Sequence, residues 1–234
     1  MRSRIVAPLT IGIALALGPA PARAQGVLDR GTFRLTLAGQ EVGSESFTIR
    51  QDGTGAAAVT LAQGSVALDT GKVAQELTSW LRISAGGARP AEYRLSVQGS
   101  AQEQITGSVA GGRFSARIVS PAGEMMREYL ASDGAVVVDD GLVHQYYFVA
   151  QRAGGASTRV ALLIPRESRQ VLATVTDGGS DPIDIGGRRV DARLLRVSGA
   201  GLPERQLWID AQGRVLRVSI PSRGFVATRT AVPG

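Results

Sequence analysis

The chain has 234 residues, of which 44% are hydrophobic, and it carries 26 Lys and Arg, 20 Asp and Glu, one His and no Cys. Without Cys the chain can form neither disulfides nor thiolate metal sites, and a single His excludes a multi-histidine metal centre. We therefore expect no metal and no cofactor, and a hydrophobic core as the main source of stability.

The first 24 residues have the pattern of a secretory signal peptide. Arg2 and Arg4 form a basic n-region, residues 6–17 form an apolar h-region, and Ala22-Arg23-Ala24 is a small-x-small cleavage site. The apolar run is shorter than the about 20 residues that a transmembrane helix needs. We therefore expect cleavage near Ala24 and a mature protein that is periplasmic or secreted and does not span the membrane.

Residues 25–234 contain no linker, low-complexity tract or change of composition, which predicts a single β-rich domain. Three of the 26 Lys and Arg lie in the signal sequence, so 23 remain against 20 Asp and Glu, and the mature chain has a net charge of +3. Such a mild charge does not favour a nucleic-acid partner.

The mature chain alternates hydrophobic and polar residues over most of its length. Phe33, Leu35 and Leu37 alternate with Thr and Arg, for example, and a turn follows at Gly39-Gln40. Short strands of this kind, at spacings near ten residues, predict an antiparallel sheet rather than βαβ units. The expected strands lie at residues 31–37, around 47–49, and at 57–61, 77–83, 92–97, 105–109, 114–118, 124–130, 160–164, 171–175, 189–197, 206–210, 214–220 and 225–229, with turns that include 86–87 and 211–213.

The stretch from Ala135 to Arg152, AVVVDDGLVHQYYFVAQR, holds the one convincing helical pattern and the only His. A helix over Leu142–Arg152 places the hydrophobic side chains on one broad face and His144 on the opposite, polar face. Asp139 and Asp140 are then placed to cap its start. The alternative is a hairpin, because Asp140 followed by Gly between apolar runs is a strong two-residue turn signal.

Catalytic motifs are absent from the sequence. No G-x-S-x-G elbow, P-loop or G-x-G-x-x-G occurs. Asp139, Asp140 and His144 could form an acid–base cluster, but two Asp before a helix are more often a cap. A pair of carboxylates for glycoside hydrolysis is a further alternative, because a sheet can bring distant Asp and Glu together. We expect no catalytic residue at a position that the sequence singles out.

Aromatic residues are the candidate ligand-binding residues. Tyr146, Tyr147 and Phe148 are consecutive, so at least one ring must contact something other than the strands beneath the helix. Trp80 and Trp208 each fall on the strand face that otherwise carries polar residues. One interpretation is a two-sided core; the other is a cleft between a curved sheet and the helix, lined by these five aromatic residues.

The V-V-V-D-D segment, the helix after it and the C-terminal motif L-W-I-D-A-Q-G-R-V-L-R-V at Leu207–Val218 resemble the half-barrel envelope proteins related to LolA/LolB-type lipoprotein carriers and to uncharacterised families of the same build. In those carriers a strongly curved antiparallel sheet wraps helices and shelters acyl chains on an apolar concave face. The resemblance therefore implies hydrophobic-ligand binding without catalysis.

Together these patterns predict a mainly β protein, with a single curved antiparallel sheet, or half-barrel, partly wrapped around one central helix. The first functional hypothesis is a periplasmic, non-enzymatic protein that binds a lipid or another hydrophobic ligand. The second is an envelope interaction or scaffold module whose sheet edges or face dock a protein partner. The third is an enzyme that acts on carbohydrate.

Overall fold

The computed structural model describes residues 25–84 and 89–234. The expected signal peptide at 1–24 and the expected turn at Gly86-Gly87 lie outside these residues. Within the described residues one large sheet has fifteen strands in the order β8-β7-β6-β5-β4-β3-β2-β1-β17-β16-β15-β14-β11-β10-β9. A separate pair, β12 (Ile183–Ile185) and β13 (Arg188–Val190), forms a small hairpin.

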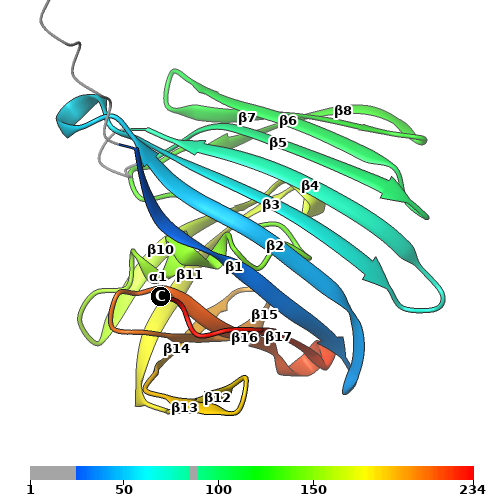
Figure 1. The fold of residues 1–234 in the computed structure, drawn as a ribbon. Coiled ribbons are helices and arrows are strands. Elements are labelled where there is room, and N and C mark those ends of the chain that lie inside the picture. Colours follow the sequence, from blue (N-terminus) through cyan, green and yellow to red (C-terminus); the bar gives the residue numbers. More distant parts are fainter. Residues whose placement is uncertain (1–24, 85–88) are drawn as a thin grey trace, which may run out of the picture.

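The first half of the large sheet is a meander in which each strand pairs antiparallel with the next. The sheet curves around the middle of the chain, as Figure 1 shows. The strands of this half are β1 (Gln25–Leu37), β2 (Gln40–Asp52), β3 (Val59–Asp69), β4 (Ala74–Ile83), β5 (Pro90–Gly99), β6 (Glu103–Ala110), β7 (Arg113–Ser120) and β8 (Gly123–Leu130).

The second half continues from β1, because the C-terminal strand β17 pairs with it. Every pair in the large sheet is antiparallel except β9 with β10, which is parallel. The prediction of one curved, mainly antiparallel sheet is confirmed. The strands of this half are β9 (Val136–Val137), β10 (Ser157–Ile164), β11 (Arg169–Ser180), β14 (Arg193–Gly199), β15 (Leu202–Ile209), β16 (Val215–Ile220) and β17 (Phe225–Arg229).

Alternation and turn chemistry explain these strands. Along β2 the buried side chains Glu45, Phe47 and Ile49 alternate with more exposed ones, so one face of the strand is inside. Between β1 and β2, Ala38 and Gly39 both have positive φ, as a tight hairpin turn requires. The predicted C-terminal hairpin is confirmed in the pairing of β15 with β16.

The helix is much shorter than the sequence predicts. Helix α1 spans only Tyr146–Ala150, and residues 139–145 form turns, so both the long helix and the hairpin alternative are wrong. The backbone instead forms tight turns, in which the N–H groups of Tyr146 and Tyr147 donate to the carbonyl groups three residues earlier, at Val143 and His144. Glu45 accepts the N–H groups of Val143 and His144 and so holds these turns in place, and neither Asp caps α1, whose N-cap residue is Gln145.

Two hydrophobic cores lie on opposite faces of the sheet. The larger one fills the concave side and includes α1 and the turns before it. The smaller one lies under the β12–β13 hairpin on the outer side, around Trp208 and Leu216. Short 3₁₀ turns at η1 (Gly55–Ala57), η3 (Pro165–Glu167) and η4 (Pro221–Arg223) complete the elements. No helix in the described part of the chain has the length and hydrophobicity to cross a membrane.

Candidate functional site

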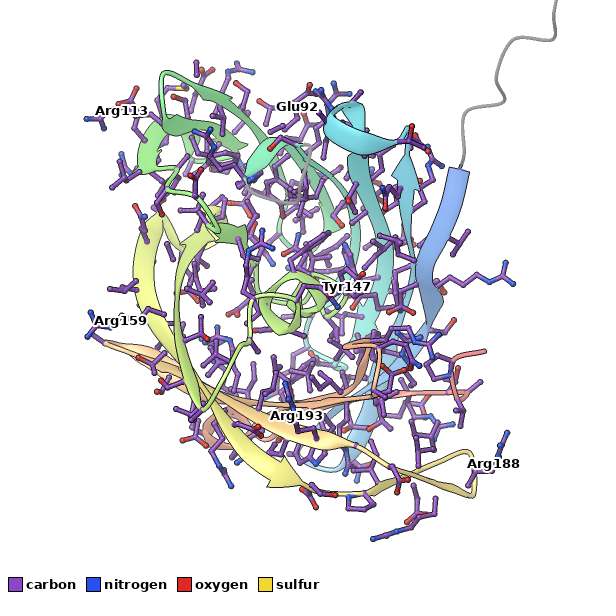
Figure 2. The ribbon with its side chains drawn as sticks, turned by 90° about the vertical axis from the view of Figure 1, so that its left-hand side faces the viewer. Glu92, Arg113, Tyr147, Arg159, Arg188 and Arg193 are labelled. Carbon is purple, nitrogen blue, oxygen red and sulfur yellow. The ribbon has the colours of Figure 1, made fainter. Side chains whose placement is uncertain are left out.

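Residues 139–151 form a segment inside the curved sheet, which we call the interior segment. Figure 2 shows Tyr147, which belongs to it, surrounded by the strands. Glu45 of β2 holds the segment through a fully buried carboxylate. One carboxylate oxygen accepts the Val143 N–H at 2.6 Å, and the other accepts the His144 N–H at 3.2 Å and contacts His144 Nδ1. One side chain of the sheet thus binds three donors of the segment.

His144 is buried, with 1% of its surface exposed, so its expected place on a polar face is wrong. Its ring stacks on Phe47 with centroids 6.0 Å apart, and its Nε2 lies 3.4 Å from Ser79 Oγ. Gly64 leaves the space for this ring, because a Cβ at that position would lie 2.6 Å from His144 Nδ1. Phe47, Gly64 and Ser79 are direct neighbours across β2, β3 and β4.

Glu45, His144 and Ser79 have the order of a Ser–His–acid triad, but they lack access to a substrate. All three are at most 2% exposed, and Ser79 Oγ faces the interior. A shallow hollow near Ser79 lies on the outer face, lined by outward-facing side chains such as Thr78 and Trp80. Within the described residues no group of three His, Cys, Asp or Glu could hold a metal ion. We assign the cluster a structural role.

Asp139 is the second anchor of the interior segment. Tyr93 OH donates to its carboxylate at 2.7 Å and the Arg166 N–H donates to it at 2.9 Å, while its own N–H donates to Gln145 Oε1 at 2.7 Å. Burial raises the pKa of Asp139 to about 7, against which the hydrogen bonds from Arg166 and Tyr93 act. The fold therefore favours the protonated form of this carboxyl.

This raised pKa gives Asp139 a pH-dependent contribution to stability. Because the folded pKa of about 7 lies above the ordinary value of 3.8, the contribution is full below pH 3.8 and is lost as the pH rises through about 7. We expect Asp139→Asn to remove this dependence, so the free energies of unfolding of the two proteins should diverge across that range. Urea unfolding at several pH values measures both free energies of unfolding. If their difference stayed constant with pH, the raised pKa of Asp139 would be contradicted.

The third anchor joins the segment to the C-terminal half of the sheet. Arg205 of β15 is 1% exposed; its Nε donates to Tyr146 OH at 2.5 Å, and its guanidinium lies 3.4 Å from Asp140. Arg223 of η4 also pairs with Asp140. Burial acts to raise the pKa of Asp140, but the hydrogen bond and charge of Arg223 outweigh it and lower the pKa. The interior segment therefore ties both halves of the sheet together.

The five aromatic residues that the sequence singles out do not meet in one place. Tyr146 and Phe148 are buried at 4% exposure, and Tyr147 is half-buried with its ring 5.4 Å from that of Phe148. Trp80 lies on the outer face under Arg94 of β5. Trp208 is also on the outer side, in the smaller core, where its Nε1 donates to Asp181. A role of these residues in ligand binding stays a prediction.

Strand β8 is the most exposed strand of the large sheet. All its side chains are exposed except that of Tyr129, including Met125 at 41%, Met126 at 54% and Leu130 at 62%. Among the described residues β8 pairs with β7 alone, so its other side is a sheet edge. Exposed apolar side chains on an edge strand are unusual, because such edges pair readily with other chains.

The direction of the β8 peptide groups follows from two contacts. The N–H and C=O of Leu130 bond to the Gln170 side chain at 3.0 and 2.9 Å, whereas the next N–H, of Ala131, bonds to Gly112 beside β7. Peptide groups alternate in direction along a strand. The peptide groups of Glu124, Met126 and Glu128 therefore point to the free edge, as that of Leu130 does.

Comparisons with known proteins give a fold neighbour. No family model matches this sequence, and no curated protein matches it. A crystal structure of a β-barrel-like protein of the domain of unknown function DUF1849 from Brucella abortus is similar, with a TM-score of 0.49 and 12% sequence identity over 87% of this chain and 94% of that chain. These comparisons show no link to LolA/LolB-type carriers, so that resemblance stays a prediction.

Proposed function

We propose that this chain is a non-enzymatic interaction module of the cell envelope that docks an extended segment of a partner protein along β8. The observation that carries the proposal is the free edge of β8, with exposed Met125 and Met126 beside peptide groups that pair with no other strand of the described residues. An extended segment that adds to such an edge gains main-chain hydrogen bonds and side-chain contacts.

The filled interior supports docking on the edge rather than inside the sheet. The concave side holds the interior segment, with its buried anchors Glu45, Asp139 and Arg205. A ligand in that place would have to displace these groups and leave their partners unpaired, at about 1 to 3 kcal/mol for each buried group. The edge of β8 needs no such rearrangement.

Photo-crosslinking with a matched pair of variants tests the proposal. A photoreactive amino acid in place of Glu124 should give specific adducts in envelope extract, and Met126→Ala, which keeps the edge N–H but shortens the side chain, should reduce their yield without abolishing them. Met126→Pro removes an N–H that faces the edge and not β7, so it should abolish the adducts while leaving the circular dichroism unchanged. Adducts that survive Met126→Pro, or that form equally from a photoreactive group at exposed Gln63 of β3, would refute docking at the edge.

A second candidate function is the binding of a lipid or another apolar ligand, the first hypothesis from the sequence. It is favoured by a hollow of about 980 Å³ at the ends of β2 to β5, in which half-buried Val42 and Leu68 adjoin the larger core. Ligand sites span roughly 300 to 1,000 Å³. Native mass spectrometry of the purified protein separates the two functions, because a co-purified lipid is expected only for the second.

A further inference from the structure

We propose that the segment docked by β8 has a basic residue, then an apolar residue, then a basic residue at alternating positions. This inference rests on the proposed docking function and specifies the partner. It follows from the side chains that β8 presents beside its free peptide groups.

Glu124, Met126 and Glu128 lie on one face of β8, because side chains of a strand alternate between its two faces. This is the outer face, since Tyr129, on the other face, is buried against Phe114. In a docked strand, one residue pairs with Met126, and the residues two positions before and after it lie opposite Glu124 and Glu128. Opposite charges in such cross-strand pairs stabilise a sheet, and like charges destabilise it. The pattern acidic–apolar–acidic on β8 is thus complementary to basic–apolar–basic.

Both carboxylates can accept a further cation. Glu124 pairs with Arg117 through both carboxylate oxygens, at 2.6 and 2.5 Å, and Glu128 pairs with Arg113 at 3.6 Å, but all four side chains are about half exposed. Figure 2 shows Arg113 projecting outward from the sheet. The single contact of Glu128 contributes little to stability, and the bidentate Arg117 leaves a second acceptor site on each oxygen of Glu124. Hydrogen bonding from Arg117 lowers the pKa of Glu124, so this carboxylate is charged at neutral pH.

Arg127 covers part of the free edge when no partner is bound. Its guanidinium donates to the carbonyl oxygen of Met126 at 3.2 Å, which is the acceptor at the centre of the edge. Charged side chains that cover edge groups are a common protection against unwanted strand pairing. A docked segment replaces this bond with a main-chain bond, and the exposed Arg127 side chain then turns to solvent.

Two synthetic peptides test the pattern by fluorescence anisotropy with the full mature chain. We expect Thr-Lys-Thr-Leu-Thr-Lys-Thr to bind about tenfold more tightly than Thr-Glu-Thr-Leu-Thr-Glu-Thr, a difference of about 1.4 kcal/mol. The preference should decrease with added salt, which screens exposed charges. Glu124→Lys combined with Glu128→Lys should reverse the preference, and Met126→Pro should abolish binding of both peptides. Circular dichroism checks that each variant is folded.

The outcomes distinguish the pattern from the docking function itself. If both peptides bind equally, the charge pattern is wrong and edge docking stands. The same conclusion follows if neither peptide binds while Met126→Pro still abolishes the crosslinks from residue 124. If the basic peptide binds the wild type and Met126→Pro with equal affinity, it does not bind at the edge, and both proposals fail.

Discussion

Replacement of Glu45 by Ala is expected to lower the free energy of unfolding by about 3 to 5 kcal/mol, the range for removing one partner of a buried pair. The carboxylate is fully buried and binds the N–H groups of Val143 and His144 as well as the His144 ring. Ala at this position leaves all three donors without a partner in a site that excludes water. Urea unfolding followed by circular dichroism measures the loss.

Glu41→Ala is the matched control on the same strand. Its side chain is 65% exposed and pairs with Arg34, which is 60% exposed, so its removal should change the free energy of unfolding by no more than about 0.5 kcal/mol. Equal effects of the two substitutions would show that Glu45 does not anchor the interior segment. His144→Ala should also destabilise the protein, because the ring fills the space left by Gly64.

The strands could be predicted from the sequence because their determinants are local. Alternation along each strand identifies the buried side, and Gly213, with positive φ, marks the C-terminal hairpin turn. The alternation also places Trp80 and Trp208 on the strand face that otherwise carries polar residues, and in the structure both lie on the outer side of the sheet. The β12–β13 hairpin that covers Trp208 is not predicted, because each of its strands has only three residues, too few for alternation to identify.

The interior segment could not be predicted because its determinants are distant in sequence. Glu45 is 98 residues from Val143, and the helical periodicity of 142–152 contains no sign of that contact. The expected polar position of His144 depended on a helix that begins at Leu142, and it fails because α1 begins at Tyr146. The sequence does contain one indication of a buried polar contact, because Glu45 is a charged residue on the same strand face as Phe47 and Ile49.

Tyr146→Ala and Tyr147→Ala are expected to differ strongly in stability, although the two residues are adjacent. Tyr146 is 4% exposed and its hydroxyl is bonded to buried Arg205, so its truncation should cost about 3 to 5 kcal/mol. Tyr147 is half-buried at the side of α1, and its truncation should cost much less. The periodicity of the sequence predicts such an asymmetry, and the structure assigns the larger effect to Tyr146.

Phe at each position separates the ring from the hydroxyl. Tyr146→Phe keeps the packed ring but leaves the Arg205 guanidinium without one of its acceptors, so a loss of about 1 to 3 kcal/mol should remain. Tyr147→Phe should be close to neutral. If Tyr147→Ala instead weakened the uptake of an apolar dye while stability held, the ring would line a ligand site, and the second candidate function would gain over edge docking. If the two Ala variants lost equal stability, both rings would belong to one filled core around α1.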